Sequence, residues 1–210
     1  MSKLPIILAS SSPRRIELMA QVGFEVIVRK PGTDEKLTRG ETPSDLVARL
    51  AHEKATDVSA TIAREFPNAI IIAADTTVVA PDGKTILGKP LDAKDAERML
   101  QLLAGETHTV LTGYCILRTV MGKPEKIRVR VVKSRVRMRT LTRTEISRYV
   151  STGEPLDKAG SYAAQGIGMS LIRSLRGSYT NVVGLPMAHL VADLKRVYGI
   201  EPDWSKVKLG

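Results

Sequence analysis

The chain has 210 residues, of which 43% are hydrophobic and 26% are charged, and its formal net charge is +10. This composition excludes a disordered chain, and no segment holds the about 20 consecutive apolar residues of a membrane span. Cys115 is the single cysteine, so an internal disulfide and a zinc–cysteine cluster are excluded as well. We therefore expect one domain over residues 1–210, located in the cytoplasm and without a membrane partner.

The first element in the chain is a strand that ends in a serine-rich turn and leads into a helix, over residues 8–21 (LASSSPRRIELMAQ). Ser12 suits the position before the helix and Pro13 suits the first helical position. Ile16, Met19 and Ala20 follow at the spacing of one buried face. The pattern therefore predicts that the helix begins at Pro13.

Two arginines occupy the first turn of this helix, where the helix dipole disfavours each cation by about 0.3–1 kcal/mol unless an anion is present. Arg14 and Arg15, the hydroxyls of Ser10 and Ser12 and the free backbone N–H groups together predict a cradle for a polyphosphate. The alternative is that both arginines pair with surface carboxylates. If they bind a ligand, replacing either one by alanine should not make the unliganded protein less stable, because a cation is removed from a helix N-terminus.

Alternating helices and strands continue through the first half of the chain. A charged, glycine-containing loop separates a short strand from a long helix that begins near Pro43 and Ser44. A nearly continuous apolar strand follows, then a turn at residues 81–84, and then a helix that ends at Gly105. The expected ranges are 25–29 for the short strand, 42–66 for the long helix, 68–80 for the apolar strand and 92–105 for the second helix.

Residues 107–141 predict a long β-hairpin that is strongly basic. Between Arg118 and Arg148 there are eleven Lys or Arg residues and two acids. Basic and apolar residues alternate along the second strand, but the basic positions change from even to odd at Val131 and Val132. A β-bulge or a register change there would keep the basic side chains on one face. The hairpin therefore suggests an alternative function, the binding of nucleic acid.

The last third predicts a short helix over 141–155, strand and loop over 174–186, and a closing helix from Pro186 to Tyr198. Helices that alternate with strands, together with one long hairpin, are typical of an α/β fold with a mixed sheet.

Asp75 interrupts an apolar run that reads as a buried strand. A lone carboxylate is costly to bury without a partner, which a metal ion or a lysine would supply. The alternative is that Asp75 ends the strand and caps a turn. A second acidic pair, Asp34 and Glu35, lies in the loop before the long helix. Because Mg²⁺ prefers carboxylates, water and substrate phosphates, the sequence is compatible with a magnesium site.

Further candidates for a phosphate clamp are Lys54 in the long helix and Lys89 in the LGKP turn, although an isolated lysine is more often a solvated surface charge. The segment 151–166 (STGEPLDKAGSYAAQG) is dense in polar residues and glycines, as loops that line binding sites often are. It contains Asp157, Lys158 and Gln165. The amide of Gln165 has both donors and an acceptor and could read the edge of a base.

Five segments, SSSPRRIELM, AADTTVV, LGKP, EPLDKAGSYAAQG and GSYTNVVGLP, follow in this order along the chain. In these motifs the sequence resembles the Maf family of nucleotide pyrophosphatases, from about Leu8 to Leu194. The resemblance implies a two-lobed α/β fold with a mixed central sheet around a deep cleft, similar to inosine-triphosphate pyrophosphatases. It also implies a homodimer.

The resemblance further implies hydrolysis of a nucleoside triphosphate to the monophosphate and pyrophosphate, with Mg or Mn as cofactor. Asp75 would then be the proton acceptor and would hold the metal with Glu35, and Lys54 and Lys89 would assist. Substrate-binding positions would be Ser10, Ser12, Arg14, Arg15, Thr76, Asp157, Lys158 and Gln165, of which Arg14, Thr76 and Gln165 match positions tied to base preference.

The run DKAGSYAAQGIG, with Tyr162 and Gln165, resembles the subgroup that favours dTTP and UTP. Nucleic acid is the less favoured partner, because aromatic residues make up only 4% of the chain and none lies between Lys123 and Arg148. The stacking platform that is typical of single-strand binders is therefore missing from the basic hairpin.

Overall fold

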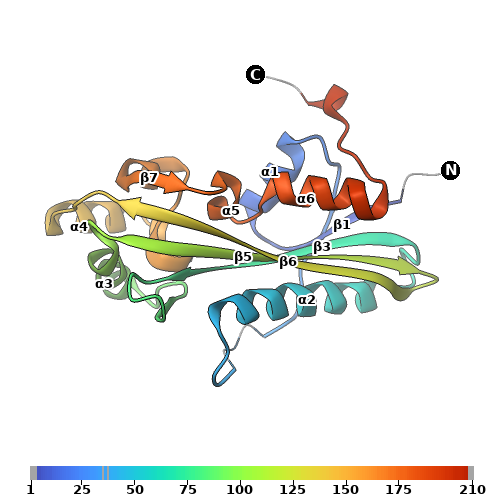
Figure 1. Cartoon of the computed structure of the whole chain (residues 1–210), viewed down its shortest axis with the longest axis horizontal. Coiled ribbons are helices and arrows are strands. Elements are labelled where there is room, and N and C mark those ends of the chain that lie inside the picture. Colours follow the sequence, from blue (N-terminus) through green and yellow to red (C-terminus); the bar gives the residue numbers. More distant parts are fainter. Residues whose placement is uncertain (1–3, 35, 37, 208–210) are drawn as a thin grey trace. The chain divides into compact units, whose positions relative to one another are not determined.

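A computed structural model describes residues 4–34, 36 and 38–207. Its strands form a sheet in the order β2-β1-β3-β5-β6-β7, with β4 paired to β3 (Figure 1). β1 is parallel to β2 and β3, whereas β4 and β7 pair antiparallel, so the predicted α/β fold with a mixed sheet is confirmed. The strands are β1 Ile6–Ala9, β2 Ile27–Arg29, β3 Ala69–Val79, β4 Ile86–Leu87, β5 Thr107–Val120, β6 Lys123–Met138 and β7 Ile172–Arg176.

The helices agree with the sequence patterns except near residue 180. The α-helices are α1 Pro13–Gln21, α2 Pro43–Ile62, α3 Ala93–Leu103, α4 Arg143–Ser151, α5 Tyr179–Val183 and α6 Met187–Asp193, which a π-helical turn extends over Leu194–Tyr198. α5 replaces part of the strand and loop predicted for residues 174–186. None of the described helices is both long enough and apolar enough to cross a membrane.

The start of α1 agrees with the prediction in position but not in detail. Ser12 occupies the N-cap and Pro13 the first turn, yet the Ser12 side chain makes no capping hydrogen bond. The buried face consists of Leu18 and Met19, whereas Ala20 is exposed, so the prediction for Ala20 was wrong. Relative to the prediction, the buried face of α1 is therefore turned away from Ala20 and towards Leu18.

The chain divides into two compact units, each made of separate segments. The first contains residues 1–75, 113–131 and 184–210, and the second contains residues 76–112 and 132–183. β3, β5 and β6 each contribute to both units.

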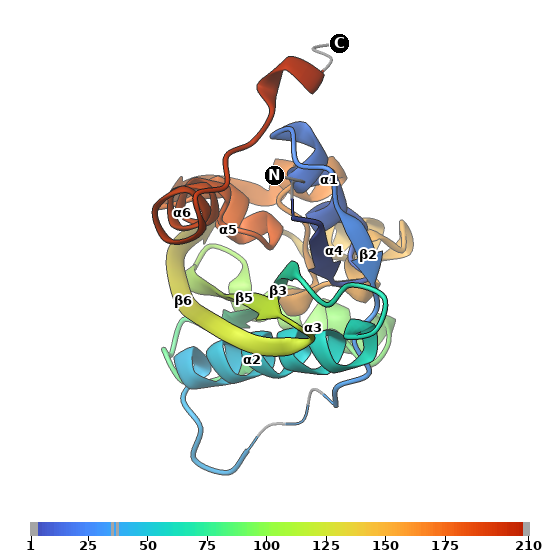
Figure 2. The same ribbon diagram turned by 90° about the vertical axis from the view of Figure 1, so that its right-hand side faces the viewer.

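In the first unit, α2 lies along one face of the strands and α6 along the opposite face (Figures 1 and 2). The α2 face buries small and branched side chains, among them Ala51, Val58, Ile71 and Cys115. α2 approaches β5 so closely that a Cβ atom on Gly113 would lie 2.3 Å from the carbonyl oxygen of Val47. Only glycine fits at this position, which brings the N-terminal part of α2 against the sheet.

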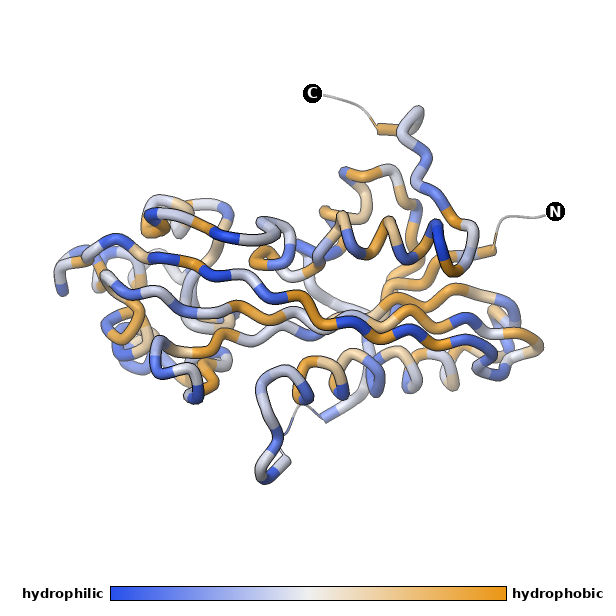
Figure 3. Tube along the Cα trace, viewed as in Figure 1, coloured by the Kyte–Doolittle hydropathy of each residue, from blue (hydrophilic) through white to orange (hydrophobic). Residues whose placement is uncertain are grey.

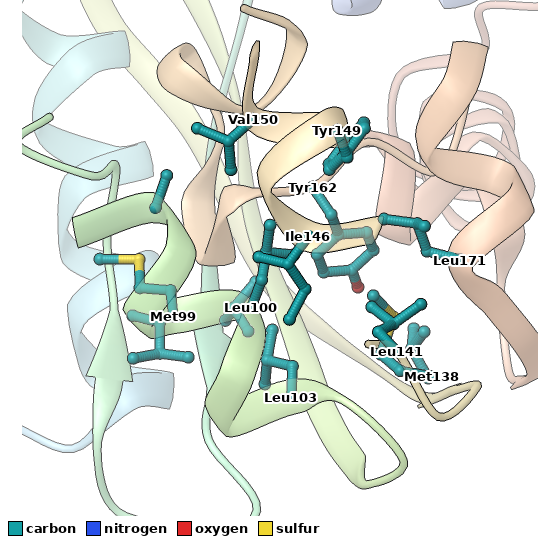
Figure 4. Close-up of a cluster of buried hydrophobic side chains, with 14 of the residues drawn as sticks. Met99, Leu100, Leu103, Met138, Leu141, Ile146, Tyr149, Val150, Tyr162 and Leu171 are labelled. Atoms are coloured by element: carbon teal, nitrogen blue, oxygen red, sulfur yellow. The ribbon is translucent and has the colours of Figure 1, made fainter. Parts of the chain in front are cut away.

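The second unit has its own core, built by α3, α4, β6 and the loop that follows α4 (Figure 4). Leu100 and Leu103 of α3, Ile146 of α4 and Met138 of β6 pack together there, and the ring of Tyr162 lies among them. The loop that contains Tyr162 is therefore part of the hydrophobic core.

The expectation that an irregularity near Val131 keeps the basic residues of β6 on one face was wrong. Even-numbered positions are less exposed than odd-numbered ones from Arg128 to Met138, so the basic residues change faces instead. Figure 3 shows hydrophilic residues recurring along β6, in contrast to the continuously hydrophobic β1. The exposed basic residues of β6 are Lys123, Lys126, Lys133, Arg135 and Arg137.

Arg128 and Arg130 are half-buried because both pair with Asp193 of α6, a carboxylate with 1% of its side-chain surface exposed. The distances from Asp193 Oδ2 are 2.9 Å to Arg128 Nε, 3.5 Å to Arg130 Nη1 and 2.7 Å to the Tyr114 hydroxyl. Burial raises the pKa of Asp193, but the ion pair with Arg128 and the hydrogen bond from Tyr114 outweigh it and the pKa is lowered overall. This part of the hairpin therefore anchors α6.

Candidate active site

Arg15 joins three segments of the first unit. β1 and β3 are parallel neighbours, with Ala9 opposite Ala73, so the turn after β1 lies next to the end of the β3 segment that belongs to this unit. Arg15 Nη1 donates to the carbonyl oxygen of Ala74 at 2.8 Å and to Ser10 Oγ at 3.4 Å, and Nε donates to the carbonyl oxygen of Gly184 at 2.8 Å. The arginine is thus held beside the residue that precedes Asp75.

These contacts contradict the expectation that Arg15 can be removed without loss of stability. The Ala74 and Gly184 carbonyls would lose a charged donor, and an unsatisfied acceptor in a partly buried place lowers stability. The role of Arg15 in binding phosphate, like that of Arg14, stays a prediction. Ser12 is close to the same turn, because its backbone N–H donates to Ser10 Oγ at 3.2 Å.

Asp75 lies inside β3, which continues to Val79, so it does not cap a turn at the strand end. Lys54 of α2 is its partner, with Nζ 2.7 Å from Asp75 Oδ1. Only 6% of the Lys54 side chain and 12% of the Asp75 side chain are exposed. The sequence called for a metal ion or a lysine as the partner of this carboxylate, and the structure contains the lysine.

The second unit holds Thr76 through a chain of hydroxyls. Thr112 Oγ1 donates to the carbonyl oxygen of Asn181 at 2.9 Å, and it lies 2.9 Å from Thr76 Oγ1. A hydroxyl has one proton, so Thr112 must accept from Thr76, and Thr76 is the donor between them.

The loop after α4 brings three predicted residues into the second unit. Lys158 Nζ donates to the carbonyl oxygen of Glu154 at 2.8 Å and also pairs with Asp157. Gln165 is half-buried. Lys89 is exposed after β4, and the backbone of the preceding Gly88 accepts a hydrogen bond from Gly160 N at 3.1 Å.

The family model "Maf-like protein" matches residues 5–197. The chain belongs to the Maf family. Two relatives named dTTP/UTP pyrophosphatase are similar to this Maf-family chain over nearly their whole lengths. The protein of Anaeromyxobacter dehalogenans strain 2CP-C is 46% identical, with 96% of this chain and 97% of the relative covered. The protein of Geotalea uraniireducens strain Rf4 is 44% identical, with 95% and 98% covered.

Among solved structures, the nucleoside-triphosphatase / dITP/XTP pyrophosphatase from Mycobacterium abscessus aligns with this Maf-family chain at a TM-score of 0.41 and 12% identity. The alignment covers 91% of this chain and 94% of that one.

Among the described residues of the Maf-family chain, Asp75 is the one predicted protein ligand for a divalent cation. No three His, Cys, Asp or Glu side chains gather as a metal-binding group in the described ranges, and Glu35, the second predicted ligand, lies outside them. Asp75 Oδ1 binds Lys54, and no other hydrogen bond reaches this carboxylate from the described residues. A single carboxylate that acts together with substrate phosphates is a sufficient protein ligand for Mg²⁺.

Sequence reasoning missed two residues that organise the loop after α4. Glu154 and Tyr149 each bind backbone N–H groups of this loop. Glu154 lies in a quoted motif, but the N–H groups that it binds are 13 and 14 residues further along the chain, and no local pattern encodes those contacts.

His108 belongs to the core of the second unit. Its Nε2 lies 2.8 Å from the Tyr162 hydroxyl, and both side chains are buried. Burial lowers the pKa of His108 to about 4 and raises the pKa of Tyr162. The imidazole is therefore neutral at pH 7 and anchors the ring of Tyr162 beneath the loop.

Proposed function

We propose that this Maf-family chain hydrolyses dTTP and UTP to the nucleoside monophosphate and pyrophosphate. The observation that carries the proposal is the buried pair of Asp75 and Lys54, next to the turn that Arg15 holds against Ala74. A buried carboxylate beside a cluster of cations is suited to accept a proton from water near an anionic substrate. The two relatives named dTTP/UTP pyrophosphatase support the choice of substrate.

In the proposed mechanism, Asp75 orients a water molecule and accepts its proton while the water attacks the α-phosphorus. Lys54 compensates the charge of the carboxylate and fixes its orientation. Arg14, Arg15, Lys54 and Lys89 stabilise the negative charge that develops on the phosphate oxygens, and pyrophosphate leaves. Ser10 and Ser12 donate hydrogen bonds to the phosphates, and Asp157 and Lys158 contact the nucleotide from the loop.

Mg²⁺ or Mn²⁺ is the proposed cofactor, with Asp75 and Glu35 as its protein ligands. When bound, such a cation polarises phosphoryl oxygens and lowers the pKa of water. Asp75 retains Oδ2 for this purpose, because Lys54, its partner among the described residues, binds Oδ1.

Gln165, Thr76 and Arg14 are the proposed determinants of base preference. The Gln165 amide can donate to a pyrimidine carbonyl and accept from N3–H, which matches uracil and thymine. Cytosine presents an acceptor at N3 and would leave these groups unpaired, which gives large discrimination. The alternative, a nucleic-acid-binding hairpin, receives no support from the relatives, and two of its arginines pair with Asp193.

The experiment is a panel of dTTP, UTP, CTP and 7-methyl-GTP with Mg²⁺ or Mn²⁺, scored by pyrophosphate release. We expect dTTP and UTP to be hydrolysed well, CTP much less and 7-methyl-GTP poorly. Release of orthophosphate instead of pyrophosphate would contradict the proposed reaction, and 7-methyl-GTP as the best substrate would contradict the proposed subgroup. On the basis of the family resemblance, we also propose that the protein is a homodimer in the cytoplasm. Sedimentation of the purified protein tests the oligomeric state.

A further inference from the structure

The amide of Gln165 is placed to contact a ligand rather than the protein. The residue is half-buried, and its side chain makes no hydrogen bond to any residue that the structure describes. An amide has two donors and an acceptor, and in a partly buried place these groups need partners. The direction of the amide depends on the backbone on either side of it, so the contacts of residues 163–168 decide what Gln165 can read.

Glu154 holds the backbone that follows Gln165. Its Oε1 accepts from the N–H of Ile167 at 2.9 Å, and its Oε2 accepts from the N–H of Gly168 at 2.8 Å. Hydrogen bonds to an ionised carboxylate are shorter and stronger than bonds between neutral groups. One side chain thus fixes two consecutive peptide groups.

The fit between this carboxylate and the turn leaves no room for side chains. Gly166 has φ +62°, and a Cβ atom there would lie 2.2 Å from Glu154 Oε1. A Cβ atom on Gly168 would lie 2.4 Å from the carbonyl oxygen of Ala163. Glycine at both positions allows the turn to close onto Glu154 and back onto Ala163.

Tyr149 holds the backbone that precedes Gln165. Its hydroxyl accepts from the N–H of Ala163 at 3.1 Å, and the ring belongs to the core cluster of Figure 4. The two flanks of Gln165 are therefore fixed from different residues, Tyr149 on one side and Glu154 on the other.

We propose that Glu154 is a positioning residue for base recognition, which acts by holding the turn that presents the Gln165 amide. This inference rests on the proposed function, in which Gln165 reads the pyrimidine edge. Glu154 acts through backbone N–H groups and contacts no reacting atom. Its loss is therefore expected to weaken the discrimination between UTP and CTP far more than the maximal rate.

The test is Glu154→Gln, which keeps the size of the side chain but replaces one acceptor oxygen by an NH₂ group facing an N–H donor. We expect the ratio of kcat/KM for UTP over CTP to fall by about 10-fold, because a loosely held amide no longer pairs selectively. The kcat for UTP should change much less than this ratio. An unchanged ratio in folded Glu154→Gln overturns the proposal.

Glu145→Gln is the matched control in the same unit. The Glu145 carboxylate also accepts from a backbone N–H, that of Thr142 at 2.8 Å, and pairs with Arg139 at 2.8 Å. Its loss should lower the melting temperature and leave the UTP to CTP ratio unchanged. An equal fall of the ratio in Glu145→Gln would attribute the effect to general destabilisation and overturn the proposal.

Tyr149→Phe keeps the proposal testable if Glu154→Gln does not fold. It removes only the hydroxyl that holds Ala163, and we expect the same fall of the ratio.

Gln165→Ala separates the role of Glu154 from the proposed function. If Gln165→Ala loses the preference for UTP while Glu154→Gln and Tyr149→Phe retain it, the role of Glu154 is wrong and the proposed function stands. If the wild type releases no pyrophosphate from UTP, the proposed function fails and the inference fails with it.

Discussion

Asp75 and Lys54 compensate each other at a point where at most 12% of either side chain is exposed. Removing one partner of a buried ion pair leaves an uncompensated charge and costs about 3–5 kcal/mol. Asp75→Asn should therefore lower the free energy of unfolding by an amount in this range, measured by urea denaturation. Lys54→Met combined with Asp75→Asn should recover much of the loss, because the buried ammonium is then gone as well.

A double variant that is less stable than Asp75→Asn alone would contradict this account of the pair. Because Asp75→Asn is expected to be less stable than the wild type, its activity must be measured at a temperature well below its melting temperature.

Arg15 is expected to stabilise the unliganded protein. Its guanidinium donates to the carbonyl oxygens of Ala74 and Gly184, and leaving partly buried acceptors unsatisfied costs about 1–3 kcal/mol. Arg15→Ala should lower the melting temperature without any nucleotide present. Arg15→Lys should recover little, because an ammonium cannot reproduce the geometry of the guanidinium fork. An unchanged melting temperature of Arg15→Ala would contradict these contacts.

The difference between Asp75 and Arg15 shows what sequence reasoning can reach at single residues. Asp75 stands out because it interrupts an apolar run, and the need for a partner follows from the cost of burial. The partners of Arg15 include Gly184, 169 residues away along the chain, and no local pattern encodes that contact. Short-range signals identify a residue that needs a partner but not which partner it finds.

At the level of elements, β6 offers a matched pair of arginines on one strand. Arg128 forms an ion pair with the buried Asp193, whereas Arg135 is exposed and faces Arg176 of β7 in register. Arg128→Gln should lower the melting temperature by at least about 3 °C, and Arg135→Gln should leave it within about 1 °C. Pyrophosphatase activity at 25 °C should be unchanged in both. Equal melting temperatures for the two variants would contradict the anchoring of α6 by β6.

The length and type of most elements follow from the sequence, because apolar periodicity and caps are local. α2 begins after Thr42, whose hydroxyl accepts from Asp45 N, and α3 begins after Asp92 in the same way. The faces of β6 could not be predicted from its alternation alone. Asp193, which draws Arg128 and Arg130 inward, lies on another element, so tertiary pairing decides which basic residues are solvated.

For the whole molecule, His108 should make stability dependent on pH. Burial lowers its pKa from 6.5 to about 4, so the unfolded chain binds a proton that the folded chain does not. This contribution is fully present above pH 6.5 and is lost as the pH falls towards 4. Between pH 7 and pH 5 the loss is about 2 kcal/mol, measurable by urea denaturation. His108→Gln, which does not titrate, should lack this loss, and an equally steep profile in His108→Gln would contradict the assignment.

The organisation of the whole molecule is less accessible from the sequence than its elements. Both compact units are assembled from separate segments, and β3, β5 and β6 run through both. No turn or linker marks the places where these strands pass from one unit to the other, because each strand stays extended across them. That the chain is one domain over residues 1–210 stays a prediction.

The central claim is that water attacks the α-phosphorus of UTP with Asp75 as proton acceptor. Single-turnover hydrolysis of UTP in ¹⁸O-labelled water, by wild type and Asp75→Asn at equal folded concentration, tests it most directly. We predict that wild type places the label in UMP and none in pyrophosphate, and that Asp75→Asn reacts at least about 10²-fold more slowly. Label in pyrophosphate, or a rate for Asp75→Asn close to that of wild type, would contradict the account.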